Sequence, residues 1–247
     1  MLAFLVCAAL HGPPPMPTAL PAEASASAEE ASLDALVETF GQAEMAWIKE
    51  IQSAAPEDQG AIFLRHPARE FWDRFAAFAE QKEARAHKWL VGNASYAGKS
   101  KELLALGRAA LGDCGENEDI VTSVAGTLRD NAGQLGYDEV IDVLAGSLAT
   151  VTSTTNQGWL ASTIGLVMLD TGDPEREAEG IRMLESTAAA YEGEEVGQHA
   201  SDELFRFRNL AIGAVAPNFE GADIDGQALS LSAQRGKIVV VDFFGFW

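Results

Sequence analysis

The chain has 247 residues, of which 47% are hydrophobic, so it can build a core of its own. Its 17 lysine and arginine residues stand against 37 aspartate and glutamate residues, which gives a net charge of -20. Such a chain repels nucleic acid and anionic lipid surfaces, and no basic stripe offsets the charge. Nucleic-acid binding is therefore excluded as a function.

The amino-terminal segment is typical of a secretory signal. Residues 2–10 are apolar and end at Gly12 and three prolines. The run is too short to cross a bilayer as a helix, but it suits the apolar region of a signal peptide, and Ala24-Ser25-Ala26 provides a small-x-small cleavage site. We expect residues 1–26 to be a signal peptide, the protein to be exported to the bacterial periplasm or cell envelope, and any membrane attachment to be an amino-terminal anchor. No basic residue precedes the run, which leaves the true start codon open.

The region from residue 27 to residue 212 has a helical pattern almost throughout. A second helix is predicted to begin at Pro67, with Phe71, Phe75 and Phe78 on one face. Core packing is the favoured interpretation of such aromatic stripes. In the first predicted helix the apolar residues recur at three- and four-residue steps: Leu33, Leu36, Val37, Phe40, Trp47, Ile48 and Ile51.

Later helices are predicted to begin near Asp119, Asp138, Asn156 and Pro174, each after a polar or glycine-containing break. Their starts lie about 18 residues apart, so helix pairs recur at about 35 residues, the spacing of helix-turn-helix repeats. We expect residues 27–212 to form an all-helical domain, a helical-hairpin or solenoid-like bundle similar to tetratricopeptide repeats.

Candidate ligand and redox residues are few in this region. No two histidines lie at i and i+4 with an acidic partner, so we expect no metal site and no cofactor. Cys7 and Cys114 are far apart and form neither a metal spacing nor a redox pair. Cys114 is interpreted as a lone loop thiol, and the acidic clusters as solvated helix faces.

The sequence changes character after Leu210. Pro217 ends the helical pattern, and Asp225-Gly226 is a hairpin turn signal between two alternating segments. The segment Ile238–Phe243 is apolar on both faces, which predicts a central parallel strand covered by helices. We therefore place a domain boundary near residue 213.

Residues 213–247 resemble the beginning of the exported thioredoxin-like thiol-disulfide oxidoreductases of the TlpA/ResA type, within the wider redoxin and AhpC/TSA group. The helical region before them is similar in texture to the amino-terminal extension of some bacterial members. Peroxiredoxin-like peroxide reductases are the alternative within the group. The matching features are Ala216-Pro217-x-Phe219, Asp225-Gly226, Leu231-Ser232, Arg235-Gly236-Lys237 and Asp242-Phe243-Phe244-x-x-Trp247.

The resemblance implies a fold and a site. Residues 213–247 would be the first strands of an incomplete α/β thioredoxin-like domain, following a mainly α region. Asp242 would be a buried proton acceptor and donor for the redox pair, and Trp247 would flank that pair. The implied partners are protein dithiol or disulfide substrates, or a protein that acts as reductant.

In the family the tryptophan at this point is followed directly by Cys-x-x-Cys, which residues 1–247 lack. Three explanations stay open: a UGA codon for selenocysteine after Trp247, a fragment or frameshifted reading, or a mature protein that works through its helices. Whichever holds, we expect the faces of Val239, Val240, Val241 and Phe243 to lack cover in this chain, and residues 214–247 to be poorly ordered or loosely docked.

Two functions follow. The first is a thiol-disulfide oxidoreductase whose helical domain positions protein substrates or a partner, inactive without the cysteine or selenocysteine pair. The second is a non-catalytic helical-repeat module that binds another protein.

Overall fold

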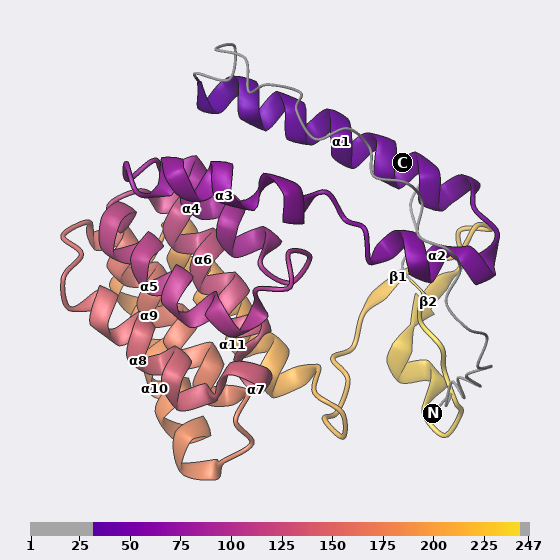
Figure 1. The fold of residues 1–247 in the computed structure, drawn as a ribbon. Coiled ribbons are helices and arrows are strands. Elements are labelled where there is room, and N and C mark those ends of the chain that lie inside the picture. Colours follow the sequence, from indigo (N-terminus) through magenta and orange to yellow (C-terminus); the bar gives the residue numbers. More distant parts are fainter. Residues whose placement is uncertain (1–31, 243–247) are drawn as a thin grey trace.

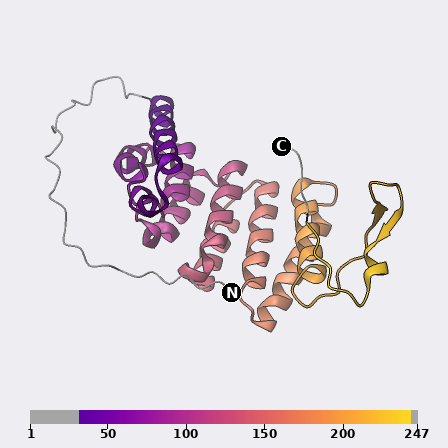
Figure 2. The ribbon, with the colours of Figure 1, turned by 90° about the vertical axis from the view of Figure 1, so that its right-hand side faces the viewer.

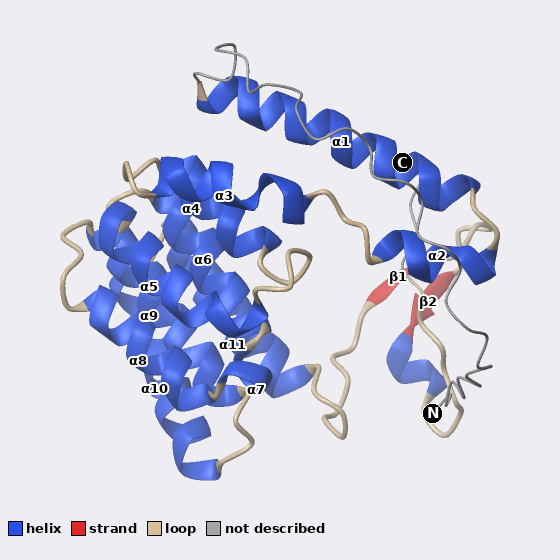
Figure 3. Ribbon diagram, viewed as in Figure 1, coloured by secondary structure: helices blue, strands red, loops and turns tan. Residues whose placement is uncertain are grey.

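The structure is a computed structural model that describes residues 32–242, and these are mainly helical with one short two-stranded sheet (Figures 1 and 3). The prediction of a mainly α region is confirmed. The predicted signal peptide, residues 1–26, and Trp247 lie outside the described residues. None of the described helices combines the length and the apolar character that crossing a bilayer would require.

The helices after the first two come in consecutive pairs. A long helix α1 (Leu33–Ser53) and a short α2 (Pro56–Phe63) precede them. The pairs begin at Ala68, Leu103, Tyr137 and Pro174, a spacing of about 35 residues that is typical of helix-turn-helix repeats. The pairs are α3 (Ala68–Ala79) with α4 (Ala84–Asn93), α5 (Leu103–Cys114) with α6 (Glu118–Asp130), α8 (Tyr137–Leu148) with α9 (Thr154–Leu169), and α10 (Pro174–Ala190) with α11 (Glu195–Asn209). Two short elements, η1 (Ser100–Glu102) and α7 (Ala132–Leu135), lie between pairs.

Local capping explains where the later helices begin. The Asn117 side chain accepts a hydrogen bond from the Ile120 N–H at 3.3 Å, at the start of α6. Asp173 accepts from the N–H groups of Glu175 and Arg176 at 2.9 and 3.0 Å, and Pro174 occupies the first turn of α10. These residues satisfy backbone donors that a helix start leaves unpaired. The predicted helix starts are confirmed to within two residues. The observed first residues are Glu118, Tyr137, Thr154 and Pro174.

The pairs stack one after another, and the second helix of each pair contacts the second helix of the next (Figure 2). Helices α4, α6, α9 and α11 thus form one layer of the stack. A continuous apolar core runs from α1 to α9, and a smaller cluster joins α9, α10 and α11 around Leu184. Phe75 is fully buried in the main core and stacks on Trp89, with ring centroids 3.8 Å apart.

Helices α1 and α2 are attached to the repeat through an aromatic cluster. His66, 3% exposed, stacks on Tyr96 with ring centroids 4.3 Å apart and meets the edge of Trp47 at 4.5 Å. Its Nδ1 accepts the Ala68 N–H at 3.1 Å, at the start of α3. Burial lowers the pKa of His66, although the nearby Glu44 carboxylate acts in the opposite direction.

The carboxyl-terminal part contains the hairpin that the sequence predicted. Strand β1 (Glu220–Ala222) pairs antiparallel with β2 (Ala228–Ser230), and a short helical turn η2 (Leu231–Gln234) follows. The Asp223 carboxylate accepts the N–H groups of Asp225 and Gln227 at 3.0 and 2.8 Å across the turn. Gly226 has a φ of 76°, a conformation that glycine adopts without a side-chain clash.

The predicted central strand Ile238–Phe243 is not found in the part of it that the structure describes. Residues 238–242 pair with no strand of the described chain, and the one sheet there contains only β1 and β2. Their apolar pattern favours a strand, but a strand forms only where another strand supplies hydrogen-bond partners. Val239, Val240 and Val241 are 43%, 87% and 45% exposed, as expected for an uncovered segment.

Candidate functional site

Of the two predicted redox residues, the structure describes only Asp242. Asp242 is exposed, so the burial that its predicted role as proton acceptor and donor requires is absent from the described structure. Trp247 lies outside the described residues. The roles of both residues stay predictions.

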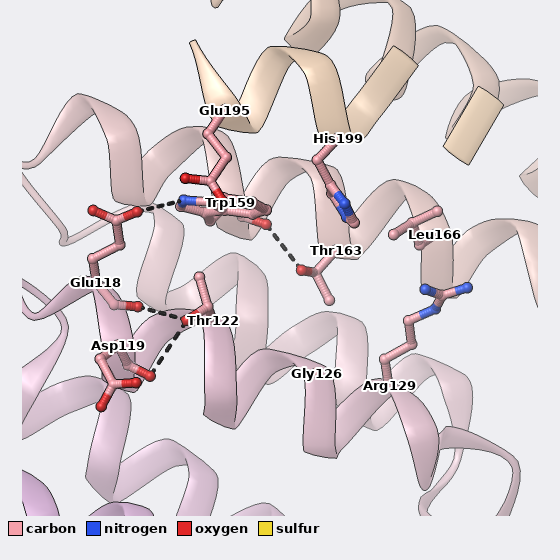
Figure 4. Close-up of a pocket in the computed structure, with 10 residues that line it drawn as sticks. All are labelled: Glu118, Asp119, Thr122, Gly126, Arg129, Trp159, Thr163, Leu166, Glu195 and His199. Atoms are coloured by element: carbon pink, nitrogen blue, oxygen red, sulfur yellow. Dashed lines mark hydrogen bonds between the residues drawn. The ribbon is translucent and has the colours of Figure 1, made fainter. Parts of the chain in front are cut away.

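A hollow lies on the face formed by α6, α9 and α11 (Figure 4). It has a volume of about 690 Å³. We call it the α6–α9–α11 groove. Its lining consists of Glu118, Asp119, Thr122, Gly126 and Arg129 from α6, Trp159, Thr163 and Leu166 from α9, and Glu195 and His199 from α11.

The groove follows from helical spacing. Thr122, Gly126 and Arg129 recur at steps of three and four residues, as do Trp159 and Thr163, so each set lies on one face of its helix. The residues between the two ends of the groove, Thr122, Gly126 and Thr163, are small, which leaves space between the helices. On the other side of α6 the side chains are buried in the core: Ile120, Val121, Val124, Ala125 and Leu128.

Trp159 defines one end of the groove. Its indole Nε1–H donates to Glu118 Oε1 at 3.1 Å, and its ring centroid lies 5.1 Å from that of His199. Figure 4 shows Glu195 extending from α11 to the indole of Trp159, His199 pointing from the same helix into the groove, and Glu118 at the nitrogen side of the indole. Trp159 is half-buried, so its ring forms part of the wall.

Three carboxylates make this end negative. Asp119 pairs with Lys88 of α4 at 2.6 Å. Neither Glu118 nor Glu195 is paired with a cation of residues 32–242. The Trp159 end therefore carries two carboxylates that no described lysine or arginine neutralises.

Arg129 defines the other end, and its charge is already compensated. Its Nε lies 2.9 Å from Asp170 Oδ2, and its Nη1 lies 3.9 Å from Glu203 Oε2. A second hollow of about 230 Å³ shares Arg129 and Leu166 with the groove and extends along α11. Its lining includes the apolar side chains of Leu169, Phe207 and Leu210. The two hollows adjoin at Arg129 and Leu166, so the negative Trp159 end is continued by a region that combines paired charges with apolar side chains.

Cys114 offers no comparable site. It is the last residue of α5 rather than a loop residue as predicted, and its Sγ lies 3.5 Å from the Lys82 carbonyl oxygen. Burial, followed by the Asp113 carboxylate, raises the pKa of this thiol, which makes it a poor nucleophile. Within residues 32–242 no group of three or more His, Cys, Asp or Glu side chains is placed to hold a metal ion.

The groove was not predicted from the sequence, because the acidic clusters were interpreted as solvated helix faces and no motif joins α6, α9 and α11. The available signal was the helical spacing of small residues on otherwise polar faces, with Thr122 and Gly126 on one helix and Thr163 beside Trp159 on another.

Comparison of the chain with protein-family models, curated proteins and solved structures gives no match, so the resemblance of residues 213–247 to thioredoxin-like proteins depends on their motifs alone.

Proposed function

We propose that the helical repeat is a protein-binding module and that its binding site is the α6–α9–α11 groove. The observation that carries this proposal is a groove of about 690 Å³, open on the face where successive helix pairs meet, with Trp159 in its wall. Stacked helix pairs build extended binding surfaces of this kind. Tryptophan is also enriched among the residues that contribute most to protein–protein binding.

We further propose that the repeat serves a thioredoxin-like thiol-disulfide oxidoreductase, exported to the cell envelope, to which residues 213–247 contribute. The bound partner would then be a protein dithiol or disulfide substrate, or the protein that supplies electrons. The support is the motif set of residues 216–247 and the hairpin that forms at Asp225-Gly226. A non-catalytic binding module is the alternative, and a peroxide reductase is the alternative chemistry within the group.

Thiol-disulfide exchange needs a thiolate or selenolate with a lowered pKa and a second cysteine to resolve the mixed disulfide. Residues 1–247 contain only Cys7 and Cys114, which do not form a Cys-x-x-Cys motif. Protein consisting of these residues should therefore not reduce insulin disulfides, and measurable reduction would contradict this reasoning. The nucleotide sequence after the Trp247 codon separates the alternatives. UGA or a cysteine codon, followed in frame by x-x-Cys, supports the oxidoreductase, whereas an ordinary stop supports the binding module.

The binding proposal is tested by filling the groove. A Cβ added at Gly126 would meet no atom within 4 Å, so a side chain can start there, and the indole of Gly126→Trp would occupy part of the groove. Gly60→Trp on α2, where a Cβ likewise meets nothing within 4 Å, is the matched control. Random peptides displayed on phage are selected on the wild-type protein and then measured against both variants.

We expect the selected peptides to lose binding to Gly126→Trp and to keep it with Gly60→Trp. Failure to enrich any peptide, or equal binding to wild type and Gly126→Trp, would refute the groove as the binding site. Circular dichroism of each variant checks that the helices remain folded.

A further inference from the structure

We infer that the partner bound in the α6–α9–α11 groove is an extended protein segment that places a lysine or arginine side chain beside Trp159. This inference rests on the proposed function, because it names the chemistry of the partner that the groove selects. It depends on the charges at the Trp159 end, the position of the indole and the different character of the Arg129 end.

The unpaired carboxylates at the Trp159 end favour binding of a cation that the described chain does not supply. Glu118 and Glu195 come from different helices and line one hollow, yet neither pairs with a lysine or arginine of the described residues. Lys88 of α4 pairs with the third carboxylate of this end, that of Asp119, at 2.6 Å. Two carboxylates that line one hollow repel each other, and a cation bound between them adds an attraction to each that offsets this repulsion.

The indole of Trp159 also favours binding of a cation. A lysine ammonium or arginine guanidinium is attracted to the face of a tryptophan ring, and more strongly where water is excluded. Glu118 is held at the indole edge by the 3.1 Å hydrogen bond from Nε1, so a carboxylate oxygen and the ring are already positioned together. The aliphatic part of a lysine or arginine side chain can pack along the ring while its charged end reaches the carboxylates.

The Arg129 end of the groove is not suited to bind a lysine or arginine side chain of the partner. Arg129 is positive and already lies against Asp170 and Glu203, so a second cation there would displace an existing ion pair. The adjoining hollow combines apolar side chains, including Leu169 and Phe207, with charged side chains that are already paired with one another, namely Arg129, Asp170, Glu203 and Arg206. A segment with a basic residue at one end and apolar residues beyond it matches the two adjoining hollows.

The test removes the charge from each side of the contact. The probe is a fluorescein-labelled peptide from the phage selection, together with copies in which each lysine or arginine is replaced by glutamine. The protein variants are Glu118→Gln with Glu195→Gln, and the control pair Glu38→Gln with Glu57→Gln. The control residues are exposed on α1 and α2 and remove the same total charge outside the groove.

We expect the groove pair to weaken binding about tenfold or more, because hydrogen bonds to charged groups are among the stronger ones in proteins. The control pair should change binding by no more than about twofold. Replacing one particular lysine or arginine of the peptide should cause a similar loss on wild type and little further loss on the groove pair, which identifies the two charges as partners. Glu195→Gln alone, a change of one exposed side chain, gives the same comparison should the double variant unfold.

The outcomes separate the two proposals. Binding that Gly126→Trp blocks but that the groove pair leaves unchanged would overturn the basic-residue inference and leave the proposed function standing. An equal loss with the control pair would also overturn the inference, because binding would then follow the overall charge of -20. Binding that Gly126→Trp does not block would overturn the proposed function itself.

Discussion

Helices α9 and α10 approach so closely that their backbones meet at two glycines. A Cβ added at Gly180 would lie 2.5 Å from the carbonyl oxygen of Gly165 and 3.1 Å from the Cβ of Met168. The nearest atom belongs to the backbone, so no change of rotamer can relieve the overlap. We predict that Gly180→Ala forces α10 away from α9 and loosens the third and fourth helix pairs.

The magnitude follows from a comparison with Gly126→Ala. Replacing glycine by alanine within a helix stabilises it by roughly 0.5–1 kcal/mol, and the Cβ at Gly126 meets nothing within 4 Å, so that variant should gain the full amount. Gly180→Ala has the same intrinsic gain but adds an overpacking cost of about 1–3 kcal/mol. The two variants should therefore differ in free energy of unfolding by about 1–3 kcal/mol, with Gly180→Ala the less stable.

The assay is urea unfolding followed by circular dichroism, combined with amide hydrogen exchange. Stacked repeats unfold partly pair by pair, so exchange shows where stability is lost. We expect faster exchange in α10 and α11 of Gly180→Ala and unchanged exchange in α3 and α4. Equal unfolding free energies for the two alanine variants would refute the close crossing of α9 and α10.

Three further predictions concern the core, the pH response and the carboxyl-terminal segment. Phe75→Ala should lower the free energy of unfolding by about 3–5 kcal/mol, because the ring is fully buried against Trp89, and a urea midpoint near that of wild type would contradict this. Burial lowers the pKa of His66, so the unfolded chain takes up the proton first. The free energy of unfolding should therefore fall as the pH drops below about 6.5 toward the folded-state pKa. In His66→Asn, urea unfolding should show a smaller decrease in this free energy between about pH 7.5 and 5.5 than in wild type. Residues 214–242 should show no cooperative unfolding transition of their own, because the hairpin is exposed, and slow amide exchange in β1 and β2 would count against this.

The helix starts could be predicted because their causes are local. Asn117, Ser153 and Asp173 each accept a hydrogen bond from an N–H two or three residues later, so the signal and its effect lie within one turn. The repeat spacing could be predicted for the same reason, since it is the sum of local helices and breaks.

The groove and the last strand could not be predicted, because both depend on residues distant in sequence. Trp159 meets Glu118, and Asp170 meets Arg129, across a separation of 41 residues in each case. Nothing in either segment identifies its partner until the helix pairs have stacked. The apolar residues 238–241 likewise indicate a strand, but pairing depends on a neighbouring strand that no described residue supplies.

The groove is held in shape by polar contacts between the loops that precede α6 and α9. The Glu116 carboxylate accepts the N–H groups of Thr152 and Ser153 at 2.7 and 2.9 Å, and these bonds lower the pKa of Glu116. Asn156 Nδ2 donates to the Gly115 carbonyl oxygen at 2.9 Å in the buried layer beneath. Because these contacts fix the start of α9 beside the start of α6, Trp159 reaches Glu118 before any partner binds. A site assembled in advance loses little conformational entropy on binding, so a short segment with few contacts can be bound specifically.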